Sequence, residues 1–270
     1  MMKRKIFMEK VSAEKLAGML EGRLDYVLEL YVLTESRLCS RPMYEFVEAY
    51  LAKGSDNSTL HTPHSTLAKG EAEFCLVYRG INDPEEVYIS IDSDDPEGFG
   101  GILRKYRPCS ITTHGDHGKG ERERSFYHVG RGKGQNGRFF LLVPGDKSLR
   151  NAFEGEADCY LDTLFCDFVE EKIYGDCGII GICGGGGGLC GYLAYCQIAE
   201  GIRDVSYLYV GEKHRGKGFG KALLDYFVCK NADEGKISYY SFADGEASER
   251  LARSRGFLPC ALRRVQNFEL

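Results

Sequence analysis

Val210-Gly-Glu-Lys-His-Arg-Gly-Lys-Gly-Phe-Gly-Lys-Ala-Leu-Leu224 decides the fold of this chain of 270 residues. An apolar, β-favouring run ends at Val210 and a helical pattern follows the glycines, so the stretch joins a strand to the start of a helix. The first N–H groups of a helix lack partners inside it, and the macrodipole places partial positive charge there. Glycines let a ligand approach this backbone closely, and basic side chains add full charges. The residues concerned are Arg215, Gly216, Lys217, Gly218, Gly220 and Lys221. The stretch therefore predicts a loop that binds a diphosphate.

Two common phosphate-binding patterns do not fit this loop. The P-loop pattern G-x-x-x-x-G-K-[ST] fails because Lys221 is followed by Ala222. The dinucleotide pattern G-x-G-x-x-G fails because the glycine spacing here is G-x-G-x-G. That pattern does occur at residues 132–137, but residues 138–143 behind it have the pattern of a strand and not of a helix. A plain glycine turn that caps a helix is the remaining alternative, and it leaves the three basic side chains unexplained.

A third pattern, Arg-x-x-Gly-x-Gly, is met by Arg215, Gly218 and Gly220. It resembles the acyl-CoA loop of the GNAT superfamily of N-acyltransferases. Flanking segments resemble, in order, the second to fifth strands of that fold and its last helix with the Gly-Phe that closes it. These segments are residues 178–183, 191–198, 203–210, 236–242 and 247–257. The resemblance covers residues 137–270 and implies an α/β (α+β) fold with a mixed, mostly antiparallel sheet flanked by helices.

The resemblance also implies a site for acetyl-CoA as co-substrate. The diphosphate would bind the N–H groups of residues 216–221, and the pantetheine arm would pair with the backbone of residues 208–210 like an added strand. The implied contacts are Leu208, Tyr209, Val210, Arg215, Gly216, Lys217, Gly218, Phe219, Gly220 and Lys221. No metal is expected.

The implied activity is transfer of an acetyl group from acetyl-CoA to a primary amine of a small molecule, by direct attack on the thioester. An alkylamine is mostly protonated at pH 7 and must lose a proton before it attacks. Several family members use a Glu early in the fourth strand, and the matching residue here, Asp204, is the candidate general base. The tyrosine that often protonates the leaving thiolate is replaced by Ala252. Either Tyr239 or Tyr240 is then the candidate acid, or the CoA thiolate leaves unaided because its pKa is far below that of an alkoxide. This departure from the family pattern favours an alternative function, a non-catalytic acyl-CoA-binding or sensing protein.

Residues 154–176 carry eight carboxylates against one lysine, and in the resembled fold this segment lies on the acceptor side. A cationic amine attracted by this field is one candidate acceptor, and a solvated helix face explains the same charges equally well. Within the segment, residues 159–173 have the apolar spacing of an amphipathic helix.

An internal repeat connects the two halves of the chain. Gly98-Phe-Gly-Gly-Ile-Leu-Arg-Lys-Tyr106 and Gly218-Phe-Gly-Lys-Ala-Leu-Leu-Asp-Tyr226 share five of nine residues at an offset of 120. This predicts an N-terminal α/β domain at residues 1–136, a degenerate GNAT-like repeat or an unrelated cap, before the acyltransferase domain at 137–270. Asp95-Pro-Glu97 stands where the second copy has Arg215-Gly-Lys217, so the first half is not expected to bind CoA.

The composition limits the class of protein. A net charge of −5 with 28 % charged residues gives no basic face, so nucleic-acid binding is not expected. No run approaches the length of about 18 apolar residues that a bilayer span requires. The basic N-terminus is not followed by an apolar region, so it does not predict a signal peptide. Eleven cysteines without C-x-x-C, many of them in apolar runs, favour a reducing cytoplasm. The expected partner is the amine, and a homodimer is an open alternative to a monomer.

Periodicity gives a coarse outline of the first half. Two or three helices are predicted within residues 12–52, the last of them around Phe46, Val47 and Tyr50. Strands are predicted at residues 74–78, 87–91 and 110–113, a helix at 98–106, and a charged loop at 114–125. In that loop His114 and His117, with Cys109 nearby, are interpreted as solvated histidines and not as a zinc site, because a second ligand pair is missing.

Overall fold

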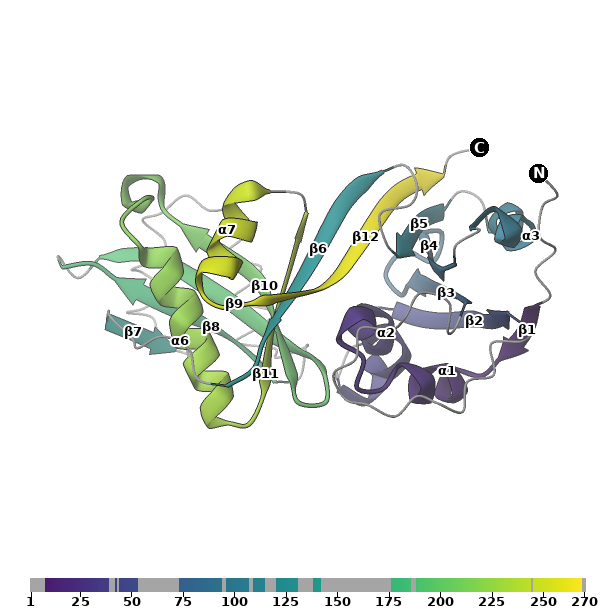
Figure 1. The fold of residues 1–270 in the computed structure, drawn as a ribbon, viewed down its shortest axis with the longest axis horizontal. Helices are drawn as coiled ribbons and strands as arrows, with labels where there is room; N and C mark the ends of the chain where they lie inside the picture. The colour runs from purple at the N-terminus through teal and green to yellow at the C-terminus, as the bar shows by residue number, and fades with distance from the viewer. Residues whose placement is uncertain are drawn as a thin grey trace. The chain divides into compact units, whose positions relative to one another are not determined.

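The computed structural model describes residues 8–38, 42, 44–52, 73–93, 96–106, 109–114, 120–130, 138–141, 176–185, 188–243 and 245–268 (Figure 1). Proximity along the backbone divides the chain into two compact units. The N-terminal unit comprises Met1–Ser36, Pro42–Ser125 and Cys260–Leu270, and the C-terminal unit is mainly Phe126–Pro259. The domain boundary between residues 136 and 137 stays a prediction. In the division into compact units, Cys260–Leu270 at the end of the chain belong to the N-terminal unit, although the predicted boundary places them in the second domain.

The C-terminal unit is built on an antiparallel meander with one parallel strand added. The meander consists of β8 (Cys177–Cys183), β9 (Leu189–Ala199) and β10 (Ile202–Val210). On one side β7 (Arg138–Leu141) pairs antiparallel with β8, and on the other β11 (Ile237–Ala243) pairs parallel with β10. The end of β6 (Glu121–His128) lies beyond β11. The mixed, mostly antiparallel sheet expected from the sequence is therefore present.

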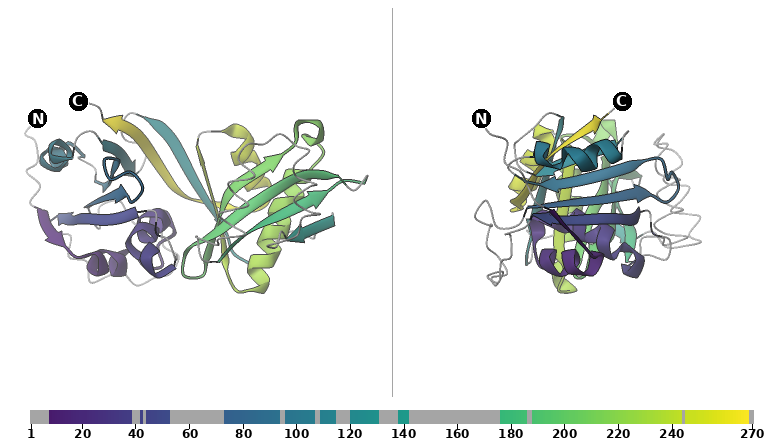
Figure 2. Two further views of the ribbon diagram at one scale, coloured as in Figure 1. Left: turned by 180° about the vertical axis from the view of Figure 1, so that it is seen from behind. Right: turned by 90° about the vertical axis from the view of Figure 1, so that its right-hand side faces the viewer.

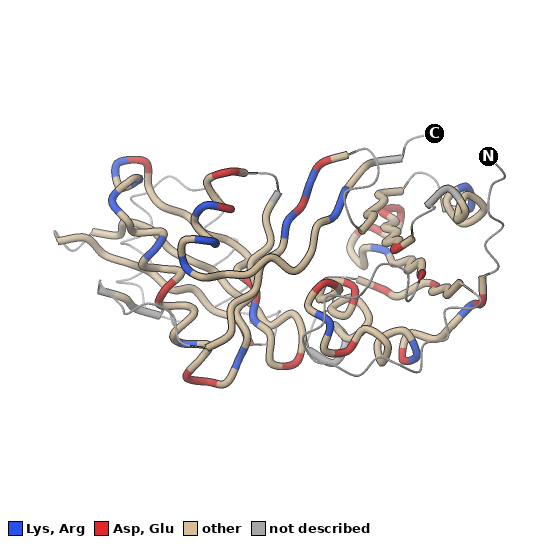
Figure 3. The backbone as a smooth tube through the Cα atoms, viewed as in Figure 1, with Lys and Arg blue, Asp and Glu red and all other residues tan. Residues whose placement is uncertain are grey.

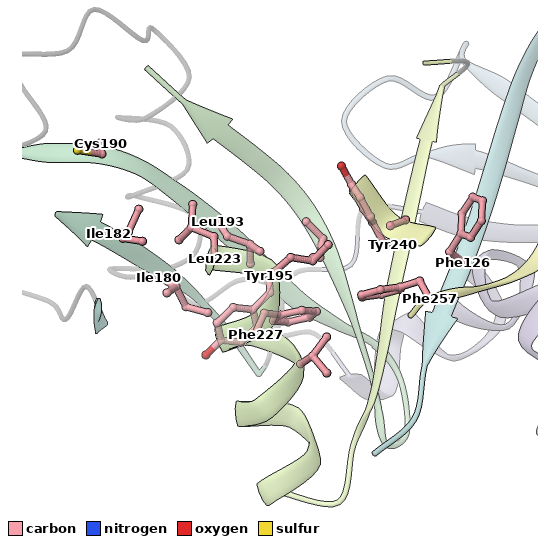
Figure 4. Close-up of a cluster of buried hydrophobic side chains, with 14 residues drawn as sticks. Phe126, Ile180, Ile182, Cys190, Leu193, Tyr195, Leu223, Phe227, Tyr240 and Phe257 are labelled. Carbon is pink, nitrogen blue, oxygen red and sulfur yellow. The ribbon is translucent and has the colours of Figure 1, made fainter. Parts of the chain in front are cut away.

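Two helices of this unit follow β10 and β11. The helix α6 (Phe219–Asp233) connects β10 to β11, and α7 (Glu246–Ser254) follows β11. From α6, Leu223, Leu224, Phe227 and Val228 point into one apolar cluster with side chains of β8 and β9 (Figure 4). The reverse view shows the strands of this unit in front of α6 (Figure 2). This packing fixes the start of α6 at the end of β10.

The N-terminal unit contains neighbouring strands with helices packed against them. Its strands lie in the order β1 (Met8–Val11), β2 (Tyr44–Ala52), β3 (Phe74–Gly80), β4 (Val87–Asp92), β5 (Cys109–His114) and β12 (Leu258–Phe268). The helices α1 (Ala13–Leu20) and α2 (Val27–Leu38), with the 3₁₀ turn η1 (Leu24–Tyr26) between them, precede β2. The 3₁₀ turn η2 (Pro96–Phe99) and the short helix α3 (Gly100–Lys105) connect β4 to β5.

Both units show the same succession of elements. In each, three antiparallel strands lead through a helix to a strand parallel to the third: β2-β3-β4-α3-β5 in one, β8-β9-β10-α6-β11 in the other. The repeated sequences occupy the same step, since residues 98–106 run into α3 and residues 218–226 run into α6. Shared topology and shared sequence at one step support the repeat hypothesis.

The two parallel pairs differ in how far they extend. The pair β4–β5 is registered from Tyr88 with Ser110 to Ile91 with Thr113, which leaves out only the first and last residue of each strand. The pair β10–β11 is registered only from Ile202 with Ile237 to Asp204 with Tyr239, although β10 continues to Val210. Parting of the parallel strands is therefore a property of the C-terminal unit.

The N-terminal unit also contains a buried polar cluster, beside its apolar core. Glu29 of α2 lies 3.1 Å from His114 Nε2 and accepts a hydrogen bond of 2.8 Å from the hydroxyl of Ser90. Arg263 of β12, only 1 % exposed, lies 3.4 Å from the same carboxylate. Burial acts to raise the pKa of Glu29, but the charges of Arg263 and His114 outweigh it, so the pKa lies well below its usual range. The prediction of a solvated His114 was wrong, since its side chain is buried within this cluster at the end of β5.

Two further predictions about the first half were wrong. Residues 44–52 form the strand β2 between β1 and β3 and not a third helix. A bulge between Phe46 and Glu48 breaks the two-residue alternation, so apolar residues fall at a spacing that imitates a helix. The predicted loop at 114–125 contains the start of β6 at Glu121. The predicted strands and the helix at 98–106 are confirmed, whereas the predicted helix at 159–173 lies outside the described residues.

None of the helices described is long and apolar enough to cross a membrane. Among the described residues, no three His, Cys, Asp or Glu side chains are grouped so as to hold a metal ion.

Candidate functional site

The strand β10 carries a bulge halfway along its length. Its pairing with β9 shifts register between Val205 and Tyr207, so Ser206 is the extra residue. Ser206 is exposed although β10 lies inside the sheet, while Asp204 and Val205 before it are buried. The bulge therefore marks the point at which the buried part of β10 ends.

Beyond this point β10 and β11 diverge (Figure 4). The last registered pair between them is Asp204 with Tyr239, and on its other side β10 stays paired with β9 as far as Val210. The backbone of residues 205–210 is thus registered with a described neighbour along one edge only. An extended chain could pair with the other edge in the manner of an added strand.

The predicted diphosphate loop follows directly. A 3₁₀ turn, η4 (Glu212–His214), leads into two glycines with left-handed backbone, Gly216 at φ 74° and Gly218 at φ 89°. Gly218 is the N-cap of α6 and, since glycine has no side chain, it does not cap the N–H groups of the first turn. A Cβ atom at either glycine would meet no atom within 4 Å. The first N–H groups of α6 therefore lie at an open surface, which suits an anion.

Basic side chains surround this helix start. Figure 3 shows Lys and Arg gathered at the turn between β10 and α6. Lys217 and Lys221 are exposed, and the side chain of Arg215 is 62 % exposed. Arg215 Nε also donates a hydrogen bond of 3.2 Å to the carbonyl of Val210, so this residue ties the turn to the end of β10.

The remaining predicted contacts serve the strand and the core. Leu208, Val210 and Phe219 pack against the apolar cluster beneath α6. A Cβ atom added at Gly220 would lie at ordinary contact distance from the side chains of Val210 and Leu251. Tyr209 lies on the opposite face of β10, with its ring 5.4 Å from that of Tyr192. The ten predicted acetyl-CoA contacts, which lie close together in the sequence, occupy the end of β10, the turn after it and the first turn of α6.

The candidate base and one candidate acid lie side by side. Arg203 hydrogen-bonds Asn231 of α6, so the next residue, Asp204, faces away from α6. Asp204 is 8 % exposed and pairs laterally with Tyr239, which is fully buried. Arg203 itself is ion-paired with Asp176 and Glu234.

The second candidate acid lies on the other face of β11. Tyr240 belongs to the apolar cluster beneath α6 and α7, and its hydroxyl hydrogen-bonds Ser248 of α7. Burial raises the pKa of Tyr240, the hydrogen bond with Ser248 opposes this effect, and the charge of Asp204 adds to it. The hydroxyl therefore holds its proton at neutral pH, as an acid must.

The end of α7 confirms the closing Gly-Phe. Gly256 has φ 87°, its N–H donates to the carbonyl of Arg253, and the N–H of Phe257 donates to that of Ala252. These two bonds form a Schellman motif, which only a residue tolerant of left-handed backbone closes cheaply. Ala252 is completely buried in the last turn and offers no hydroxyl.

Sequence reasoning missed Ser206 and Ser248. The bulge that exposes Ser206 leaves no mark in the local pattern Arg203-Asp-Val-Ser-Tyr207. The hydrogen bond of Ser248 depends on how α7 packs on β11. Both are consequences of pairing and packing, for which no local signal exists.

The comparisons with known proteins agree with this geometry. Residues 147–257 match the model of the acetyltransferase (GNAT) family. A GCN5-related N-acetyltransferase from Sphaerobacter thermophilus superposes with a TM-score of 0.55 at 12 % identity, covering 100 % of this chain and 99 % of that one. A GNAT-family acetyltransferase from Colwellia psychrerythraea gives a TM-score of 0.55 at 11 % identity, with 97 % of this chain and 100 % of that one covered. At these identities the likeness concerns the fold, and no curated protein matches the sequence. The chain therefore carries an acetyltransferase domain of the GNAT family, to which residues 147–257 belong.

Proposed function

We propose that the C-terminal unit transfers an acetyl group from acetyl-CoA to the primary amine of a small molecule. The observation that carries the proposal is the junction of β10 with α6. A strand that has parted from its parallel neighbour ends in an open, glycine-lined helix start among basic side chains. The cysteine usage, in addition, favours a reducing cytoplasm as the site of action.

Binding follows from the backbone. The N–H groups of residues 216–221 would hold the diphosphate, with Lys217 and Lys221 adding charge. The edge of β10 that faces away from β9 at residues 208–210 would hold the pantetheine arm by strand-like pairing. Bound acetyl-CoA would then present its thioester near the bulge at Ser206, where the two strands part.

Proton transfer is assigned to Asp204 and Tyr240. Acetyl-CoA supplies the activated acyl group, and attack by the amine forms the C–N bond while the C–S bond breaks. Asp204 receives, through a water, the proton that the ammonium group loses before it attacks. The hydroxyl of Tyr240 gives its proton to the leaving sulfur, and the second proton, which the nitrogen loses after attack, restores the Tyr240 hydroxyl through solvent. Tyr240 is preferred to Tyr239 because its side chain packs toward α7, the helix that carries the acid in the resembled family.

The Tyr240→Phe variant should lower kcat by about 10²-fold, in the range for loss of one general acid. The same change at Tyr239 should lower kcat by less than about threefold, because its side chain lies on the face of β11 away from α7 and is not assigned to the leaving sulfur. Steady-state rates of CoA release from the two variants check this assignment. If kcat falls more in Tyr239→Phe than in Tyr240→Phe, Tyr239 is the general acid and the assignment to Tyr240 is wrong.

A cationic acceptor remains part of the proposal. Seven of the eight carboxylates at residues 154–176 lie outside the described residues. The eighth, Asp176, is ion-paired with Arg203 and Lys236 and so contributes little field. A panel of polyamines, aminoglycosides and amino acids tests the class of acceptor, and turnover of anionic acceptors alone would contradict it.

Each chain should bind one acetyl-CoA. In the N-terminal unit the pairing of β4 with β5 continues to within one residue of the end of each strand, and the face toward α2 holds the buried polar side chains of Glu29 and Ser90. Titration calorimetry should therefore give a stoichiometry near one. A stoichiometry of two would show that the N-terminal unit also binds.

The decisive test of function is consumption of the thioester. The purified chain is incubated with acetyl-CoA and the amine panel, and free CoA and acetylated amine are measured by chromatography and mass spectrometry. Equal amounts of both products support the transferase. Binding of acetyl-CoA without consumption by any amine would favour the non-catalytic sensor.

A further inference from the structure

Two cysteines of the C-terminal unit face each other across neighbouring strands. Cys177 of β8 is the direct partner of Cys196 of β9 in the antiparallel register. The N–H of Gln197 donates to the carbonyl of Asp176 at 2.9 Å. This bond joins the residues just outside the pair, so Cys177 and Cys196 form a non-hydrogen-bonded pair, the type whose side chains approach most closely.

The spacing of such a pair suits a disulfide. Cα atoms in non-hydrogen-bonded pairs lie about 4.5 Å apart, inside the range of about 4.4 to 6.8 Å found for disulfides. Direct partners also point to the same face of the sheet, so no backbone movement is needed. In the registers of the described strands, no other two cysteines are direct partners.

In the dithiol form Cys196 is turned toward the opposite neighbour. Its Sγ lies 3.1 Å from the hydroxyl of Ser206, the exposed residue of the bulge. Cys196 is also the register partner of Asp204. The thiol thus contacts the strand that carries the candidate base, at the point where β10 leaves β11.

We propose that Cys177 and Cys196 form a reversible disulfide when the protein meets a peroxide, and that this bond releases Ser206 and slows acetyl transfer. To reach Cys177, the sulfur of Cys196 must rotate from β10 toward β8, so the contact with Ser206 and the disulfide exclude each other. The effect on transfer rests on the proposed function, whereas formation of the bond does not.

The chemistry is balanced with hydrogen peroxide as the oxidant. Cys177 is the more accessible of the two, since Cys196 is only 7 % exposed. The thiolate of Cys177 attacks one peroxide oxygen, the O–O bond breaks, and a sulfenic acid and one water result. Cys196 then attacks the sulfenic sulfur and expels a second water. Two thiols lose two electrons and two protons in all, and a dithiol reductant reverses the step.

Peptide mapping tests the bond itself. The full chain is treated with limited hydrogen peroxide, alkylated, digested without reduction and analysed by mass spectrometry. A linked Cys177–Cys196 peptide that disappears after dithiothreitol is expected. Cys75 serves as the internal control because it is fully buried, its thiol pKa is raised by that burial, and it should stay reduced. Linkage of other cysteines, or oxidation of Cys177 without a link, would overturn the disulfide.

Rates test the consequence. Oxidised wild type should transfer acetyl groups about tenfold more slowly than reduced wild type, the size expected for loss of one positioning hydrogen bond, and dithiothreitol should restore the rate. The Cys177→Ser variant keeps the contact between Cys196 and Ser206, so peroxide should leave its rate unchanged.

In Ser206→Ala the reduced protein should already be about tenfold slower, with little further loss on oxidation. A linked protein with the full rate, or a Ser206→Ala variant with the full rate, would overturn the control of transfer. Absence of transfer in reduced wild type would contradict the proposed function and leave the mapping result to decide the disulfide.

Discussion

Replacing Gly218 by tryptophan is expected to abolish acetyl-CoA binding, from micromolar affinity in the wild type to none that calorimetry detects. Gly218 is the N-cap of α6, and its φ of 89° is a conformation that L side chains rarely adopt. The space where its Cβ would stand is open. A bulky side chain there would occupy the region through which a diphosphate must approach the first N–H groups of the helix. Loss of several charge-assisted hydrogen bonds at once accounts for an effect of more than about 100-fold.

Gly235 offers a matched control at the other end of the same helix. It also has left-handed backbone, with φ 70°, and open space at the Cβ position. Gly235→Trp therefore imposes a comparable backbone strain without touching the loop. Circular dichroism and thermal unfolding of both variants report the strain, and calorimetry reports binding. Wild-type affinity in Gly218→Trp would show that this helix start does not hold the diphosphate.

Truncating Arg263 to alanine is expected to destabilise the N-terminal unit by about 3–5 kcal/mol. The side chain is 1 % exposed, and Nη2 lies 3.0 Å from the carbonyl of Asp25 and 3.4 Å from Glu29. Glu29 is itself 4 % exposed, so the variant leaves a buried carboxylate without its guanidinium. A loss of this size is a large share of the typical stability of a domain, about 5–15 kcal/mol.

The neighbouring Arg264 provides the control in the same strand. Its side chain points to the other face, where Nη1 donates to the carbonyl of Gly120 at an exposed position. Arg264→Ala should cost less than about 1 kcal/mol. Hydrogen exchange read by mass spectrometry localises the effect, and peptides from β4 and β5 should exchange faster in Arg263→Ala only. Equal exchange in the two variants would mean that the Arg263–Glu29 contact does not stabilise this unit.

Local sequence predicted the C-terminal unit better than the N-terminal unit. Around the loop each prediction rested on a local requirement, such as the left-handed backbone of Gly218 or the apolar spacing of Leu223, Leu224 and Phe227 on α6. In the first half the bulge at Val47 gave the strand β2 the apolar spacing of a helix, so a helix was predicted there. His114 was misplaced because its partner Glu29 is 85 residues away in the sequence.

By itself the sequence determined where the loop would bend and where α6 would begin, because glycine alone combines positive φ with open access to the backbone. Through its resemblance to the GNAT fold, it also predicted the order of the elements from β8 to α7 along the chain. Only the tertiary structure decided that β12 completes the N-terminal sheet and supplies Arg263 to Glu29, and that Cys196 stands between Cys177 and Ser206. Strand pairing joins residues far apart in the chain, and the choice of partner is made by the packing of the whole sheet, which no short stretch of sequence encodes.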